Sequence, residues 1–599
     1  MRKGWIAGIV ALVVVVVAAG VGFYLFSQNN VQAQVEQSVR RLFANPPAPY
    51  TKATYDKLDV ALASRRLTID NIVLERSTPP YIIKIDRFEA TGIDTDAIQT
   101  VFDPDKYKDG AADQTFRKLA DTLTLFKVDA DSREGGRITV DQLTAKGIQG
   151  HQFNVKPEPA TISAMSERER TLMALDALRL DSVSYDNFNV SGSKAPSGKV
   201  RHLEVTNFSR QGVGAVVVDE LDLINPKDDT RTSWKRFELR DIPGDPWFDF
   251  VITGKPPTDM MRLIALGGVK IDDLRVVPGK RGGPMVRIAS FDMGKVDRKK
   301  LERFSLTGFE ASGPGGGATI GAIEIKDLEW EQLLGLINQP DRMLKFADAS
   351  YRVGKFSIRD VGGASMDMIG AKLKEIAFAG YVDHDSGKTE STFTIDSFEI
   401  DAQKVKEPSL AMGLKMLGYE KVNLSMDVAG AGDLKAGTAT FDKFRIFGPQ
   451  IGDFNLTLAM SDYVSPPVTK APPSIDAALA PLLAAKLQKM KISWQDDGLT
   501  PRIYKAAGAN AGAAPDQIRD KLVMQVKSFG ELYKDDPKVS AAIQAIVDYL
   551  NKPGSITIDA KPPVPPRFGE LGGVLDGKGG GPPDLPEAFR VLGLTVTAN

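Results

Sequence analysis

One eight-residue pattern, apolar-x-apolar-Asp-x-apolar-x-apolar, recurs along the chain and restricts its fold more than any other feature. Its copies centre on Asp70, Asp86, Asp141, Asp181, Asp219, Asp272, Asp396 and Asp442. Apolar residues two apart share one face of a strand, but here the second apolar pair is out of phase with the first. The pattern therefore predicts a β-bulge or tight corner at each Asp-x step, where an Asp side chain can accept bonds from nearby backbone N–H groups. The spacing between copies is irregular, which argues against a strict solenoid.

Helical spacing interrupts these strands. An i, i+3, i+4, i+7 pattern with Asp113 as N-cap predicts a helix through Phe116, Leu119, Ala120, Leu123 and Phe126. Further helices are expected at 166–177, 257–266, 330–346 and 408–417, and one that begins after Asp536 with Pro537 in its first turn. We therefore expect an α+β fold dominated by β-structure, with bent antiparallel sheets, packed amphipathic helices and an elongated form.

The N-terminus carries an uncharged run from Trp5 to Phe26. At about 1.5 Å per residue it would span about 33 Å as a helix, which matches the apolar core of a bilayer. Arg2 and Lys3 precede the run, and the next cations are Arg40 and Arg41. The positive-inside rule then predicts one transmembrane helix with a cytoplasmic N-terminus and the rest of the chain exported. The alternative is a signal peptide cleaved after Ala33.

Composition shifts divide the chain into six predicted segments. They are a signal-anchor at 1–30, a short helix and Pro-rich linker at 31–50, a strand-rich repetitive region of two or three sub-units at 51–463, a Pro-rich linker at 464–474, a helical unit ending in a strand at 475–560, and a Pro/Gly-rich tail with a terminal strand at 561–599.

Composition also excludes several kinds of chemistry. The chain of 599 residues has no Cys and three His, so thiol nucleophiles, Cys-ligated zinc and His-rich metal sites are excluded. Lys+Arg and Asp+Glu number 76 and 77, for a net charge of −1, which argues against nucleic-acid binding. Calcium binding by the recurring Asp residues is disfavoured because the copies lack the flanking glycines of the calcium-binding β-helix repeat. We expect no cofactor and no metal.

The short motifs do not support catalysis either. Gly387-Lys388-Thr389 lacks the upstream glycine of a phosphate loop, and Gly313 to Ala318 is followed by a predicted strand instead of a helix. Ser365 lacks the second glycine of a nucleophile elbow, because Asp367 stands there. Asp383-His384-Asp385 is interpreted as a surface turn. No catalytic, cofactor-binding or metal-binding residue is therefore nominated.

The strand segments "LTIDNIVL", "ITVDQLTA" and "FTIDSFEI", together with the single anchor and the absence of Cys, resemble the AsmA-like group of bacterial envelope proteins. The chain is also similar to uncharacterised anchored periplasmic proteins of alphaproteobacterial type. There the similarity lies in "LTPRIYKAAGANAGAAPDQIRDKLVMQ", "VDYLNKPGSITIDAKPPVP" and the final "LTVTAN". The AsmA-like resemblance implies a long curved β-sheet with a hydrophobic groove and a role in lipid passage or outer-membrane upkeep. It brings no site motif, so no functional residue is carried over.

We therefore expect a non-enzymatic periplasmic protein of the cell envelope, held in the inner membrane through Trp5–Phe26, that contacts lipids and binds no nucleic acid. One alternative is a scaffold for other envelope proteins, and another is a periplasmic hydrolase that uses carboxylates. The apolar residues on both sides of the Asp-x corners, such as Ile69, Ile72, Ile395 and Phe398, are expected to line one concave face.

Overall fold

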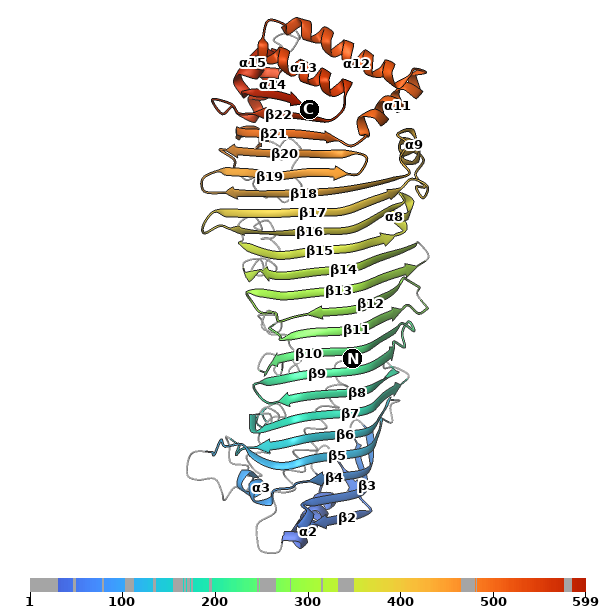
Figure 1. Ribbon diagram of the computed structural model, residues 1–599. Coiled ribbons are helices and arrows are strands. Elements are labelled where there is room, and N and C mark those ends of the chain that lie inside the picture. The colour runs from blue at the N-terminus through green and yellow to red at the C-terminus, as the bar shows by residue number, and fades with distance from the viewer. Residues whose placement is uncertain are drawn as a thin grey trace. The chain divides into compact units, whose positions relative to one another are not determined.

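The structure is a computed structural model (Figure 1). It describes residues 31–46, 50–77, 80–102, 112–132, 136–153, 176–192, 197–244, 265–280, 282–313, 316–331, 350–464, 482–575 and 584–599, with single residues at 165, 169, 173, 247 and 480. The chain divides into two compact units, 1–298 with 311–314, and 299–310 with 315–599.

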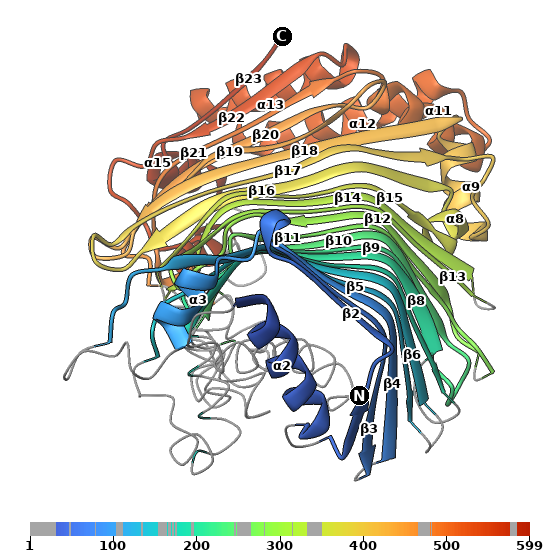
Figure 2. The ribbon, with the colours of Figure 1, turned by 90° about the horizontal axis from the view of Figure 1, so that it is seen from below.

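Antiparallel β-sheet dominates both units. The protein is 58% strand and 22% helix, with 23 strands in the described part. The predicted α+β fold of several sheets with helices packed against them is therefore wrong. The chain is instead a β-structure in which most strands within each unit pair antiparallel with the next, and the described helices lie mainly at strand ends and at the terminal parts of the units (Figures 1 and 2).

Within the described residues no helix is long and apolar enough to cross a membrane. The predicted span Trp5–Phe26 lies outside these residues, as do most of the 464–474 linker and most of the helices predicted at 166–177, 257–266 and 330–346.

The first unit is a meander of long strands. After the short strands β1 and β2, each strand from β3 to β11 pairs antiparallel with its successor, which brings the meander to β12. Its elements are α2 (Val31–Ala44), β1 (Lys52–Thr54), β2 (Lys57–Ala61), η1 (Leu62–Ser64), β3 (Arg66–Ser77), β4 (Pro80–Thr91), α3 (Thr95–Phe102), β5 (Arg117–Ser132), β6 (Gly136–Gly150), β7 (Leu178–Gly192), β8 (Ser197–Phe208), β9 (Gly212–Ile224), β10 (Arg231–Pro243), β11 (Gly268–Val277) and β12 (Met285–Met293).

The strands of this unit bend along a line of residues that crosses β3 to β12 (Figure 2). The line contains one residue per strand, and on alternate strands that residue has a left-handed backbone with φ between 48° and 55°. Backbone pairing is kept on both sides of the line, as at Ile69 with Phe88 and Ile72 with Ile85. We call this line the bend row; its members are Asn71, Asp86, Lys127, Asp141, Asn187, Arg201, Glu220, Lys235, Asp273 and Ala289.

A second line of left-handed residues crosses the same strands closer to one end. Its left-handed members are Gly92, Gly147, Asn207 and Asp241. Gly147 has φ +61°, and a Cβ atom there would lie 1.9 Å from Oδ2 of Asp181 on β7, so only glycine fits without a shift. The unit therefore bends twice along each of its central strands.

The predicted corners at the Asp pattern are confirmed. Asp70, Asp219, Asp272 and Asp396 immediately precede a left-handed residue, and the register shifts beside Asp396 and Asp442. The remaining copies, Asp86, Asp141 and Asp181, lie in one of the two lines of bends. The described bonds of these Asp side chains run to neighbouring strands rather than to local backbone N–H groups, as at Asp70 Oδ1, which accepts from Arg87 Nε at 2.9 Å.

The helix predicted through Phe116 to Phe126 is wrong, because this segment forms β5. The two bends explain the error. Each bend moves the apolar positions by one residue, so the gaps Ala120 to Leu123 and Leu125 to Val128 are three residues instead of two. A twice-bent strand thereby imitates the spacing of a helix.

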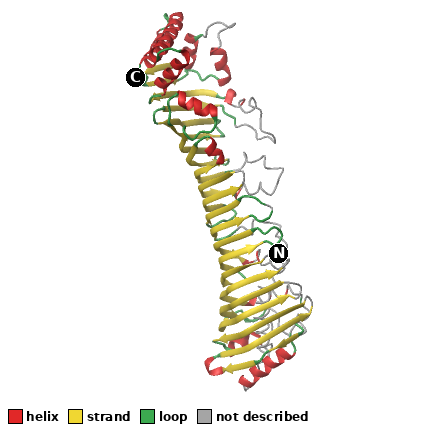
Figure 3. Ribbon diagram, turned by 90° about the vertical axis from the view of Figure 1, so that its right-hand side faces the viewer, coloured by secondary structure: helices red, strands yellow, loops and turns green. Residues whose placement is uncertain are grey.

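The second unit continues the same construction. Strands β14 to β23 pair antiparallel in chain order, and Figure 3 shows most of its helices gathered near the C-terminus. Its elements are β14 (Gly316–Glu329), β15 (Tyr351–Gly363), α8 (Ala364–Met368), β16 (Ala371–Asp383), β17 (Lys388–Asp401), α9 (Pro408–Met416), β18 (Lys421–Asp433), β19 (Thr438–Gly448), β20 (Gly452–Ser461), β21 (Lys486–Asp496), α11 (Leu499–Ala511), α12 (Pro515–Gly530), η5 (Glu531–Tyr533), α13 (Pro537–Asn551), β22 (Ser555–Ala560), α14 (Phe568–Leu575), α15 (Leu585–Leu592) and β23 (Leu594–Ala598). Strand β13 (Lys300–Gly313) has residues in both units.

Two predicted helices of this unit are confirmed. The helix expected at 408–417 is α9, and the helix expected after Asp536 is α13. The Asp536 side chain accepts from the backbone N–H groups of Lys538 and Val539, which caps α13, and Pro537 occupies its first turn.

Candidate functional site

The sheet of the second unit carries an unbroken apolar face. Two adjacent rows of directly paired residues cross β14 to β23, and every member of both rows is apolar. We call them the apolar rows. One contains Ile325, Phe356, Phe378, Phe393, Val428, Phe444, Leu456, Ile492, Ile558 and Val596, and the other contains Ile323, Ile358, Ile376, Ile395, Met426, Ile446, Phe454, Trp494, Ile556 and Ala598.

The opposite face of the same strands is charged. Lys355 Nζ lies 3.6 Å from Glu324 and 3.3 Å from Glu375, on the strands to either side. Arg445 and Asp453 form a two-pronged ion pair with donor–acceptor distances down to 2.6 Å, and the Arg445 guanidinium holds the pKa of the Asp453 carboxyl below its usual range. The sheet is therefore amphipathic, with water suited to one face and apolar material to the other.

In the first unit, the matching face is covered over β3 to β7. Ile69, Ile85 and Val140 are 5%, 4% and 5% exposed. They belong to a core that also contains Ile98 and Val101 of α3, and side chains of α2 pack against it. This part of the sheet therefore has the second layer that an apolar face requires.

In the second unit, the members of the apolar rows are only half-buried. The described helices meet the sheet at its limits: α8 and α9 lie at strand ends (Figure 2), and α13 packs on β22 and β23 through Val539 and Ala542 against Leu594 and Val596. No described helix packs over the middle of the apolar rows on β15 to β20. Further apolar groups can therefore pack on this face. Each CH₂ group buried there would contribute about 0.8 kcal/mol to the free energy of binding.

Burial of Ile69 and Ile72 in the core agrees with the expectation that residues flanking the corners share one face. Ile395 and Phe398 flank the corresponding bulge in the second unit, pair with Met426 and Leu424, and are half-buried.

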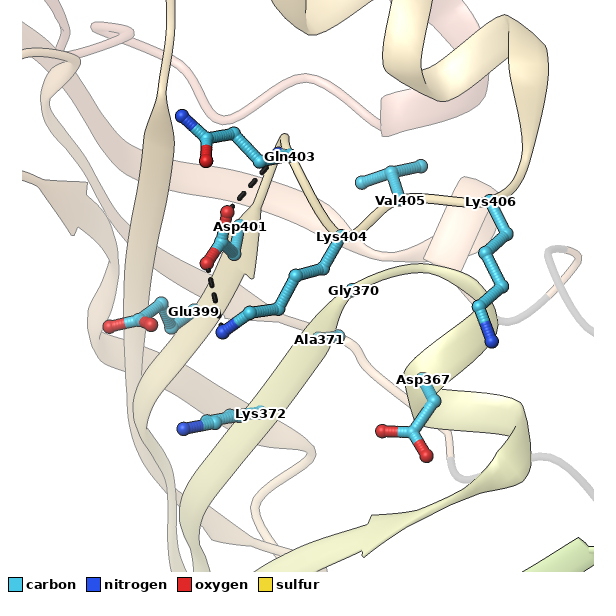
Figure 4. Close-up of a pocket in the computed structure, with 10 residues that line it drawn as sticks. All are labelled: Asp367, Gly370, Ala371, Lys372, Glu399, Asp401, Gln403, Lys404, Val405 and Lys406. Atoms are coloured by element: carbon cyan, nitrogen blue, oxygen red, sulfur yellow. Dashed lines mark hydrogen bonds and ion pairs between the residues drawn. The ribbon is translucent and has the colours of Figure 1, made fainter.

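A shallow pocket of about 410 Å³ lies where β16, β17 and α8 meet (Figure 4). Two of its three acidic side chains, Asp401 and Glu399, are held by neighbours. Asp401 lies 3.1 Å from Lys404 Nζ and accepts from the backbone N–H of Gln403, and Glu399 lies 3.7 Å from Lys421. The Lys404 ammonium holds the pKa of Asp401 below its usual range. A general acid needs a raised pKa, so Asp401 does not fit that role.

The motifs considered from the sequence occupy structural positions. Ser365 and Asp367 lie in the one-turn helix α8, and residues 387–389 lie where a turn enters β17. Asp383, at the end of β16, accepts from the backbone N–H groups of Asp385 and Ser386 and from the Ser386 hydroxyl, which lowers its pKa and closes the predicted surface turn. Within the part of the chain that the structure describes, no cluster of three or more His, Asp or Glu could hold a metal ion.

Residues of the apolar rows such as Phe356, Phe378 and Phe393 were not singled out in the sequence. The available signal was the recurrence of apolar pairs two residues apart. That signal marks the face of a strand, but it does not say which strands lie side by side.

A family model described as "Uncharacterized protein" matches residues 445–599. This stretch holds β20 to β23, the helices between them, and the three C-terminal segments that resemble uncharacterised anchored proteins. No curated protein matches the chain. The family match concerns about a quarter of the chain and says nothing about the AsmA-like group.

Proposed function

We propose that the apolar rows of the second unit bind the acyl chains of lipids. The observation that carries this proposal is their composition: the two adjacent rows across ten strands contain no charged, hydroxyl or amide side chain, their one N–H donor being the Trp494 indole that bonds to Tyr549, and they remain half-buried. An acyl chain has no hydrogen-bonding groups, so a surface made almost entirely of hydrocarbon side chains suits it.

Two features of the sequence support a place in the cell envelope. The uncharged run Trp5–Phe26 would anchor the chain in the inner membrane, with its bulk in the periplasm, and the strand texture resembles the AsmA-like group. The role that we propose is non-enzymatic: the protein handles lipids at or between the membranes of the envelope.

The proposal is tested by photo-crosslinking at two adjacent residues of β17. Phe393 lies in an apolar row, whereas Thr392 is exposed on the opposite face. With benzoylphenylalanine at position 393, we expect phospholipid adducts after irradiation of cells, detected by mass spectrometry of the purified full chain. The same group at position 392 should give none. Equal labelling at both positions, or none at 393, would contradict lipid binding by this face.

A scaffold for envelope proteins is the second candidate, because α12 and η5 expose large apolar side chains. Met524 is 62% exposed and Leu532 is 64% exposed, and exposed apolar patches are typical of protein contacts. The scaffold is favoured if benzoylphenylalanine at position 524 yields protein adducts while position 393 yields no lipid.

A further inference from the structure

The last strand of the chain has an unpaired edge. Strand β23 pairs with β22, and the pair Asn599 with Ser555 exchanges both backbone hydrogen bonds, at 3.0 and 2.9 Å. Because such pairs alternate along antiparallel strands, Thr595, Thr597 and Asn599 direct their N–H and C=O groups to β22. Leu594, Val596 and Ala598 direct theirs away from the sheet, and no described residue bonds to them.

This edge lacks the features that usually prevent edge-to-edge pairing. Natural edge strands carry charges, prolines or bulges. The short strands β1 and β2 of the first unit follow this rule with Lys52, Lys57 and Asp59. Strand β23, with the sequence Leu-Thr-Val-Thr-Ala, has no charged residue, no proline and no register shift against β22. Of the protections named here, the described strand has only its short length.

We propose that β23 pairs with β23 of a second copy of this chain, antiparallel and centred on Val596. In this register Leu594 faces Ala598 and Val596 faces Val596, so every outward N–H and C=O group of the three residues finds a partner. Thr595 faces Thr597 on the other side of the sheet, where both are exposed in the single chain.

Self-pairing is favoured over pairing with an unrelated strand because the edge is complementary to itself on both faces. Leu594, Val596 and Ala598 belong to the face on which α13 packs, so the apolar face continues from one copy to the other. The threonines form cross-strand pairs of a kind that stabilises sheets. No like charges meet in this register.

Cysteine pairing tests the register directly, because the natural chain has no Cys. In the proposed dimer Thr595 and Thr597 of different copies form a non-hydrogen-bonded pair, with Cα atoms about 4.5 Å apart, which is within disulfide range. We expect Thr595→Cys and Thr597→Cys full-length proteins, carrying different tags, to form a disulfide heterodimer when mixed and mildly oxidised. Each variant alone should cross-link far less, because equal positions are offset by two residues.

Ala598→Pro provides the matched control. Proline removes an outward N–H, and an edge strand tolerates it because the bonds to β22 come from other residues. Introduced into both cysteine variants, it should abolish the heterodimer and leave the melting temperature close to that of the parent. Thr597→Pro, by contrast, removes an N–H that bonds to β22 and should lower the melting temperature.

Three results would overturn the proposal: no disulfide in the mixture of two folded variants, equal cross-linking within each variant alone, or cross-linking that survives Ala598→Pro. A cysteine captured by another protein instead of the second copy would replace self-pairing with partner-strand addition.

Discussion

Substitution of Lys127 in β5 directly tests the physical basis of the bend row. Its backbone is left-handed, with φ +48°. An L-residue in that conformation costs about 1–2 kcal/mol, and glycine avoids most of this cost. A β-branched residue suffers most, because its side chain is the most crowded there. We therefore expect Lys127→Gly and Lys127→Val to shift the free energy of unfolding in opposite directions.

The size of each change in the free energy of unfolding follows from the surroundings of Lys127. Its side chain is 75% exposed and Nζ lies 3.9 Å from Asp86, so loss of this pair costs well under about 1 kcal/mol. Glycine relieves about 1–2 kcal/mol of backbone strain but costs about 0.5–1 kcal/mol in a strand, so it should be stabilising by up to about 1 kcal/mol. Valine should be destabilising by about 1–2 kcal/mol.

Lys84 of β4 is the matched control, because it is also an exposed lysine within a strand but has ordinary extended backbone. There glycine should destabilise and valine should be neutral or stabilising, so the order of the two variants reverses. Hydrogen exchange of peptides from 117–150, measured by mass spectrometry on the full chain, reports the local opening free energy. The reasoning is refuted if glycine and valine rank in the same order at both positions.

Three further predictions concern the core, an ion pair and the topology. Leu143→Ala in the covered core should lower the free energy of unfolding by about 2–5 kcal/mol. Phe393→Ala on the half-buried face should lower it by less. Equal losses of unfolding free energy in denaturant titrations would show that both faces are equally buried. Because Arg445 lowers the pKa of Asp453, the pair stabilises the fold above about pH 4 and this contribution fades as pH falls below it. Arg445→Gln should therefore destabilise the protein more at pH 7 than near pH 2, and a pH-independent difference in melting temperature would contradict this. Alkaline phosphatase fused after Asn599 should be active in a bacterial cell, since the positive-inside rule predicts an exported C-terminus. An active cytoplasmic reporter at the same site would show the opposite topology.

The sequence by itself determined where several of the strands bend. The Asp pattern placed corners at positions such as Asp70 and Asp272, because an apolar pair that changes phase within a strand requires a local irregularity. It also determined the cap and start of α13 at Asp536 and Pro537, since capping is a local interaction. These features depend on neighbours within a few residues, so one chain segment contains the information.

Tertiary structure alone decided how the strands combine. The sequence did not show that Phe356, Phe378 and Phe393 lie side by side, because strand register joins residues far apart in the chain. It also assigned Phe116 to Phe126 to a helix, because two bends in one strand reproduce helical spacing. Whether an apolar face is covered, as at Leu143, or half-buried, as at Phe393, depends on which elements pack across it, and no pattern within a single strand records that.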